Sequence, residues 1–278
     1  MARTARLKRK DIGSAYYHLM SRTNDQRFLF VKGEAKTQLV SALRRAAAFS
    51  GIALNAYTAL DNHFHVVCKV TVSDAVISED ELIERYAVLK GRKAAEELAE
   101  HWGMLRHAEL FDELDAEHDR LRRRMNDISE FIKTFKEEFD RWFKKSRKYC
   151  GSIWSGRFKS TLIESGEYLS VCKRYVVLNP VRAGIVTRIR DYRWSWCEDD
   201  EKPSCSAGPV PSRRLMRRIV QIGEGRIFGS REFVMSGIFA MGDRLKAKWV
   251  TARAVMAAEE KAEMAYASHG WKLAKEVA

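Results

Sequence analysis

The chain has 278 residues, with 50 lysines and arginines against 37 aspartates and glutamates, and its formal net charge is +13. Its hydrophobic content of 46% supports a packed core and excludes global disorder, and its four prolines exclude a collagen-like chain. The five cysteines form no CxxC pair, and no apolar run is long enough for a signal peptide or a transmembrane helix. We therefore expect a cytoplasmic protein without a zinc finger, and its basic charge makes nucleic acid the first partner to test.

The first third of the chain predicts a strand, a helix and a pair of strands. Leu39 and Leu43 are spaced as on one face of a helix, and Gly51 stands where such a helix would end. Aromatic and β-branched residues dominate the flanking segments, and Asp61-Asn62 is a turn signal between two of them. We predict a strand at 14–22, a helix at 32–50, and strands at 52–60 and 63–72.

An acidic segment then interrupts the basic chain. Residues 74–119 hold 14 acidic and 5 basic residues, so this segment has a net charge of −9 and the rest of the chain has +22. The segment is rich in Glu, Ala and Leu, and Ser78 is suited to cap a helix, so we predict a helical insertion. Charge runs usually form solvated faces, and we expect the insertion to take no part in chemistry and to point away from DNA or gate access to it.

Past the insertion, the sequence predicts an amphipathic helix, a strand or hairpin, and a short second helix. In the first helix, Ile128, Phe131, Phe135 and Phe139 follow steps of three and four residues. The order β-α-β-β-insertion-α-β-α predicts an α+β fold with a ferredoxin-like β-α-β-β-α-β core over residues 1–198. We place the amphipathic helix at 127–148, the strand or hairpin at 151–164, and the short helix at 166–179, ended by Pro180.

The C-terminal region differs in composition from the rest of the chain. Residues 199–212 contain three of the four prolines and indicate a linker. Residues 213–278 predict a helical extension, including helices at 230–241, with Ser230 as its cap, and at 251–276. Two helical patterns around a Gly-containing turn in its first part suit either a helix-turn-helix or a plain packing extension.

Two short motifs carry residues that could do chemistry. His63-Phe64-His65 lies on a predicted strand, where alternate residues share a face, so two imidazoles could hold one divalent cation. A structural pair of histidines is the alternative. Tyr175 and Asn179 are spaced as on one helix face, and offer a phenol nucleophile and a hard amide ligand. The alternatives are a half-buried core tyrosine and an asparagine that merely stops a helix before proline.

These motifs resemble a known family. LDNHFHVV resembles the metal-binding HUH motif of single-tyrosine transposases, and RYVVLNPVRAGIV followed by DYRWSW resembles the tyrosine-bearing stretch of the REP-associated tyrosine transposases. MNDISEFIKTFKEEFDRWF, GSIWSGRFKSTLIES and YYHLMSRTNDQRFLF are similar to other parts of that family, so the resemblance spans residues 14–197. The chain has Leu60-Asp61-Asn62 where the family usually has Met-Pro-Asn, and it lacks the usual paired serine after the DYRWSW tryptophan.

The resemblance implies an HUH nuclease fold and a metal-dependent DNA strand transfer. It implies that Mg²⁺ or Mn²⁺ is held by His63, His65 and Asn179, and that Tyr175 attacks phosphorus to form a 5′-phosphotyrosyl intermediate. The implied substrate is single-stranded DNA near a hairpin formed by a palindromic repeat. We expect a nucleoid-associated protein that works as a monomer, with a dimer as the alternative.

Basic and aromatic residues near the motifs are candidates for DNA contact. Aromatic residues in a strand are more often core than stacking platforms, which applies to Trp154 and Phe158, and His18 is similarly either near the site or a core residue. The candidates for phosphate contact are Arg157, Lys159, Arg174 and Arg182, together with Lys8, Arg9 and Lys10 on an N-terminal arm.

Two other functions compete with this reading. A catalytically inactive DNA-binding protein on the same fold, such as a repressor, would retain the basic surface without the chemistry. An RNA-binding ferredoxin-like module would need exposed aromatic residues on its sheet face, where this sequence places histidines. The presence of all three implied residue types favours the enzyme.

Overall fold

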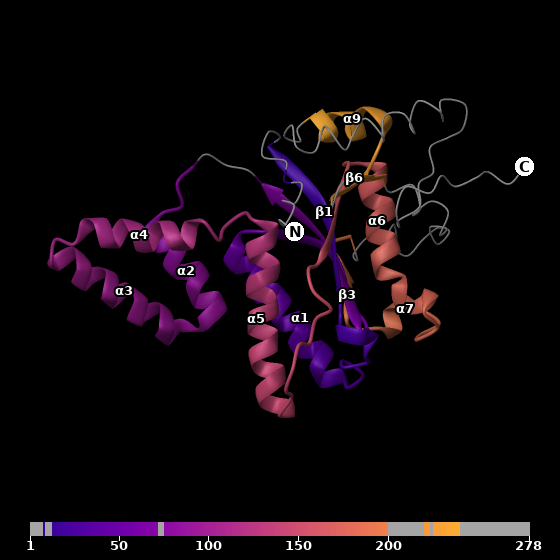
Figure 1. The fold of residues 1–278 in the computed structure, drawn as a ribbon, viewed down its shortest axis with the longest axis horizontal. Coiled ribbons are helices and arrows are strands. Elements are labelled where there is room, and N and C mark those ends of the chain that lie inside the picture. The colour runs from indigo at the N-terminus through magenta and orange to yellow at the C-terminus, as the bar shows by residue number, and fades with distance from the viewer. Residues whose placement is uncertain (1–7, 9–12, 72–74, 200–219, 223–224, 240–278) are drawn as a thin grey trace, which may run out of the picture.

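The computed structural model describes residues 8, 13–71, 75–199, 220–222 and 225–239, and its centre is a twisted sheet (Figure 1). Four antiparallel strands form the core in the order β2-β3-β1-β4. This strand order, with a helix after β1 and another before β4, confirms the predicted ferredoxin-like core. The four strands are β1 (Ser14–Arg22), β2 (Ala53–Ala59), β3 (His63–Thr71) and β4 (Lys159–Ile163).

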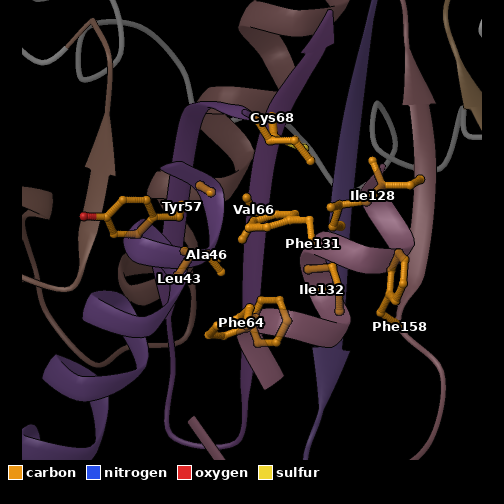
Figure 2. Packing of buried hydrophobic residues seen from close by; sticks show 14 of the residues in the cluster. Leu43, Ala46, Tyr57, Phe64, Val66, Cys68, Ile128, Phe131, Ile132 and Phe158 are labelled. Carbon is orange, nitrogen blue, oxygen red and sulfur yellow. The ribbon is translucent and has the colours of Figure 1, made fainter. Parts of the chain in front are cut away.

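Two helices cover one face of this sheet and form the main hydrophobic core. They are α1 (Gly33–Ser50) and α5 (Ile128–Arg147). The predicted capping is confirmed, because Gly51 ends α1 with φ of 67°, a left-handed conformation that glycine adopts without strain. Phe131 and Ile132 of α5 face Phe64 of β3 (Figure 2), and all three are buried. Complete burial of such side chains contributes about 2 kcal/mol each.

The opposite face of the sheet is covered by α6 (Glu167–Val177) and the single turn α7 (Asn179–Arg182). The helix predicted at 166–179 therefore ends two residues before its predicted end. Leu178 separates the two helices, and Pro180 lies in the first turn of α7, where its missing N–H costs nothing. The sheet thus has a strongly packed face and a second face on which α6 lies over the central strands.

The insertion is helical as predicted and packs on the outer side of α1. Its helices are α2 (Glu79–Lys90), α3 (Arg92–His107) and α4 (Phe111–Arg122). The Ser78 hydroxyl accepts a hydrogen bond from the Glu81 N–H at 3.2 Å, which confirms the predicted cap. Trp102 is completely buried in a separate small core that includes Phe49 of α1. In Figure 1 the insertion projects from the side of the molecule opposite α6 and α7.

The C-terminal region differs from the prediction. Residues 213–241 were expected to form two helices, but β6 (Val220–Ile222) and β7 (Gly225–Phe228) form a hairpin, and β7 joins the sheet in parallel with β4. Only the second helix is confirmed, as α9 (Arg231–Phe239), with Ser230 accepting from the Phe233 N–H at 3.2 Å. The described residues 220–222 and 225–228 are strands where a helix-turn-helix would have the end of its first helix and its turn, and residues 213–219 lie outside the described chain. The predicted linker beyond Asp199 and helix at 251–276 lie outside the described residues.

Three short elements complete the described chain. Neither 3-10 turn was predicted, and the strand was missed because its segment has only three residues, a tryptophan between a serine and a cysteine. That strand pairs with β2 at the edge of the sheet. In the described part of the chain no helix is long and apolar enough to span a membrane. The three elements are η1 (Asn24–Gln26), η2 (Ile189–Asp191) and β5 (Ser195–Cys197).

Candidate active site

The sheet face under α6 carries a cluster of three histidines. Strand alternation sends Phe64 into the main core and His63 and His65 to the opposite face. His18 lies on β1, the neighbouring strand, in register with Val67 of β3, and so points to the same face as the two histidines. The expected side-by-side placement of His63 and His65 is confirmed, with ring centroids 5.1 Å apart.

The helix α6 brings Tyr175 onto this cluster. Its ring centroid lies 5.9 Å from that of His65 and 6.2 Å from that of His18, edge-on to both. His18 and His65 stack with centroids 5.0 Å apart, and His18 Nε2 lies 2.8 Å from His65 Nδ1. The two motifs, more than a hundred residues apart in sequence, therefore meet in one place. His18, which the sequence left as either a residue near the site or a core residue, therefore lies at the site.

Burial and nearby cations keep the two motif histidines neutral. Burial, together with the Arg22 charge opposite it on β1, lowers the pKa of His63 to about 4, although Asp61 opposes the shift. Burial also lowers the pKa of His65 well below 6.5, reinforced by the neighbouring His18 and His63 and by the charges of Arg22 and Arg182. Neutral imidazole is the form that binds a metal ion, so these shifts suit ligation at neutral pH.

The hydrogen bonds of Asn62 fix the tautomer of His63. The Asn62 amide nitrogen donates to the Gln26 carbonyl at 3.0 Å, so its oxygen is the atom 2.6 Å from His63 Nδ1. Because an amide oxygen only accepts, Nδ1 must carry the proton and Nε2 must carry a lone pair. An imidazole held this way fits a divalent cation, as metal-ligating histidines usually donate their other N–H to a fixed acceptor.

Asn179 lies one helical turn beyond Tyr175, as the spacing predicted. Its amide nitrogen donates to the Tyr175 carbonyl at 2.9 Å, so the amide oxygen is left as the available ligand atom. The Arg182 guanidinium lies over the Tyr175 ring at 4.8 Å. Its Nη1 is buried and makes no hydrogen bond among the described residues. A buried donor of this kind is costly unless it binds an acceptor, and a phosphate oxygen is suited to that role.

The other predicted DNA contacts fall into three groups. Lys159 pairs with Met20 on the histidine side of β1, and Arg157 is exposed just before it. Arg174 is half-buried beside Tyr175 on α6. Trp154 and Phe158 are instead buried in the main core, so base stacking by these two residues is excluded. On the N-terminal arm, Lys8 is paired with Asp127, while residues 9 and 10 lie outside the described chain.

A basic cleft beside α6 and α7 was missed by the sequence reasoning. It has a volume of about 660 Å³ and is walled by Leu178 and Trp196. Its arginines are Arg188, Arg190 and Arg193, all exposed. The only sequence signal was the density of arginines after the tyrosine motif. A basic groove with an aromatic wall is suited to a nucleic-acid backbone.

The fold and the site together define a ferredoxin-like α+β protein with a histidine–tyrosine cluster on one face of its sheet. Among the described residues, no group of three or more His, Cys, Asp or Glu side chains is arranged to hold a metal ion. The ligand set implied by the resemblance consists of two histidines and one amide, His63, His65 and Asn179.

Comparisons with known proteins give a structural likeness. No protein-family model and no curated protein matches the chain. The chain is similar to a solved structure of a REP-associated tyrosine transposase bound to a REP hairpin, at 16% identity and a TM-score of 0.44. The likeness covers 78% of this chain and 94% of the other. A likeness of this size assigns neither family nor function, so the site rests on its own geometry.

Proposed function

We propose that the protein is a metal-dependent single-stranded DNA endonuclease and strand transferase that acts at hairpin-forming palindromic repeats. The observation that carries this proposal is the position of the Tyr175 ring, 5.9 Å from His65 and 6.2 Å from His18. A phenol beside two imidazoles, under a guanidinium, is a suitable setting for attack on a phosphodiester.

The proposed chemistry is a transesterification at Tyr175. Its phenol loses a proton to water as the Oη–P bond forms, the P–O3′ bond breaks, and the departing 3′-oxygen takes up a proton. The DNA 5′ end is then held as a phosphotyrosine, and attack by a 3′-hydroxyl reverses the step without ATP. The Arg182 guanidinium stabilises negative charge that develops on the phenol oxygen and the phosphate.

His63, His65 and Asn179 would hold the divalent cation, Mg²⁺ or Mn²⁺. Bound there, the cation supplies Lewis-acid polarisation of the scissile phosphate. The protein's own contribution is to keep both imidazoles neutral and to aim their ligand atoms. Asn62 does this for His63 through its amide oxygen.

DNA binding is assigned to the cations around this face. Arg157, Lys159, Arg174 and Arg182 would contact phosphates near the site, and the acidic insertion lies on the far side of the molecule (Figure 1). Repulsion between the insertion and the DNA backbone is therefore small. Because one chain supplies His65 and Tyr175 together, we also propose that the enzyme works as a monomer with its tyrosine acting in cis.

A covalent-adduct assay tests the enzyme against the inactive DNA-binding alternative. The protein is incubated with labelled hairpin oligonucleotides that carry repeats from its own genome, with Mg²⁺ or Mn²⁺, and resolved on a denaturing gel. We expect an adduct that is lost in Tyr175→Phe and His63→Ala. Tyr168→Phe is the matched control, because this tyrosine lies on the same helix but packs on Phe228.

The result separates the two functions. Loss of the adduct in Tyr175→Phe but not in Tyr168→Phe supports the proposal. Tight hairpin binding without an adduct under either metal overturns it and favours a DNA-binding protein without catalysis. An adduct that survives in Tyr175→Phe overturns the assignment of the nucleophile.

A further inference from the structure

His18 is a buried histidine that the two motifs do not include. Its side chain comes from β1, the central strand, and the residue is only 8% exposed. It contacts both parts of the proposed machinery, with its Nε2 2.8 Å from His65 Nδ1 and its ring 6.2 Å from that of Tyr175. His18 therefore lies between a proposed metal ligand and the proposed nucleophile.

The short contact between the two imidazoles allows only two proton arrangements when both are neutral. In the first, His65 Nδ1–H donates to His18 Nε2, and His65 Nε2 carries a lone pair. In the second, His18 Nε2–H donates to His65 Nδ1, and the remaining nitrogen of His65 carries the proton. Only the first arrangement leaves His65 able to ligate through Nε2.

The neighbouring histidine favours the first arrangement. His63 Nδ1 faces an obligate acceptor, the Asn62 amide oxygen at 2.6 Å, so its Nε2 bears the lone pair. His63 and His65 stand two residues apart on one strand face. A ligating histidine usually donates its other ring N–H to a fixed acceptor, and His18 occupies for His65 the place that Asn62 occupies for His63.

We infer that His18 is a positioning residue that accepts a hydrogen bond from His65 Nδ1 and thereby presents His65 Nε2 to the proposed cation. This inference rests on the proposed function for its purpose, but the tautomer itself is a property of the protein alone. His18 also limits rotation of the His65 ring, because the two rings are stacked at 5.0 Å with planes 14° apart.

The first test reads the tautomer directly and needs neither metal nor DNA. Long-range ¹H–¹⁵N spectra of metal-free protein at pH 7.5 distinguish protonated from unprotonated ring nitrogens. We expect His65, assigned by its loss in His65→Gln, to be protonated at Nδ1. A His65 protonated at Nε2 overturns the inference.

The second test separates the hydrogen bond from packing with two variants of one residue. His18→Gln places an amide oxygen where Nε2 stands and retains the acceptor, whereas His18→Phe retains a stacked ring without an acceptor. By calorimetric titration with Mn²⁺, we expect about 10- to 100-fold weaker binding in His18→Phe and recovery to within about threefold of wild type in His18→Gln. His118→Phe, which replaces a buried histidine that meets Trp102 edge-on, is the control for loss of a buried imidazole.

The outcomes distinguish this inference from the proposed function. Equal Mn²⁺ affinity in His18→Phe and wild type, with both variants folded by circular dichroism, overturns the role of His18 and leaves the metal site standing. A wild-type protein that binds no Mn²⁺ overturns the proposed ligand set instead, and the tautomer spectrum then still decides the hydrogen bond. If Mn²⁺ binds weakly to both His18→Phe and His18→Gln but with normal affinity to His118→Phe, the acceptor role is overturned in favour of a packing role.

Discussion

His63 makes the stability of the metal-free protein depend on pH. Its pKa in the folded protein is about 4, chiefly because the side chain is buried and also because Arg22 lies nearby, while an unfolded chain has the ordinary value of 6.5. Between these values the unfolded chain binds a proton that the folded protein does not, so the stability contribution is lost as pH falls. At about 1.4 kcal/mol for each tenfold ratio, and discounted for partial solvent exposure, His63 costs about 2 kcal/mol on going from pH 7 to 4.5.

Urea unfolding in EDTA at the two pH values measures this cost. For each protein, the loss is the free energy of unfolding at pH 7 minus that at pH 4.5. Groups other than His63 titrate in the same way in both proteins, so their contributions cancel when the two losses are compared. We expect the loss in His63→Gln to be smaller than in wild type by about 2 kcal/mol. His107→Gln, at the exposed end of α3, controls for removal of a histidine at the surface. Equal losses in His63→Gln and wild type would refute the reasoning.

Four further substitutions probe the core, an ion pair, the insertion and the cleft. Phe135→Ala removes a completely buried ring that meets Phe64 edge-on at 5.0 Å, and should lower the free energy of unfolding in urea by about 3–5 kcal/mol. Lys173→Ala removes the cation that pairs with two partly exposed carboxylates on the segment after β5 and should cost about 1–2 kcal/mol in the same assay. Trp102→Ala should raise hydrogen exchange in α2–α4 without changing hairpin affinity, because the insertion has its own core. Arg190→Ala should reduce the slope of log affinity against log salt by about 0.7, the value for one phosphate contact on a single strand, in fluorescence anisotropy; an unchanged slope would remove the cleft from the DNA path.

The core of the fold could be predicted from the sequence because its strands and helices follow local residue patterns. The strand at 14–22 and the helix that begins near residue 128 were predicted to within a residue, since alternation and helical spacing are strong there. The candidate site was also predictable in part, because His63 and His65 share a face whenever their segment is a strand. That Tyr175 would meet them could be taken only from the resemblance, since it depends on how α6 crosses the sheet.

Other features depend on tertiary partners and left no local signal. The hairpin at 220–228 is short and becomes a strand pair because β7 joins β4, so its apolar residues were mistaken for a helical pattern. His18 could not be assigned because its position beside His65 depends on how β1 pairs with β3, a long-range pairing that no local sequence pattern shows. The basic cleft likewise exists only after β5 joins β2 and carries its neighbouring arginines beside α6.

The alternation of β3 links the stability of the protein to the geometry of its site. Phe64 is held in the main core by Phe135, while its neighbours His63 and His65 face the opposite side. A slip of β3 by one residue would exchange core and site, so the packing on one face selects the register that gives the chemistry on the other. The insertion follows β3 but packs on the outer side of α1 around a core of its own. The residues of α5 that pack on Phe64 therefore help to hold the strand register that places His63 and His65 on the site face.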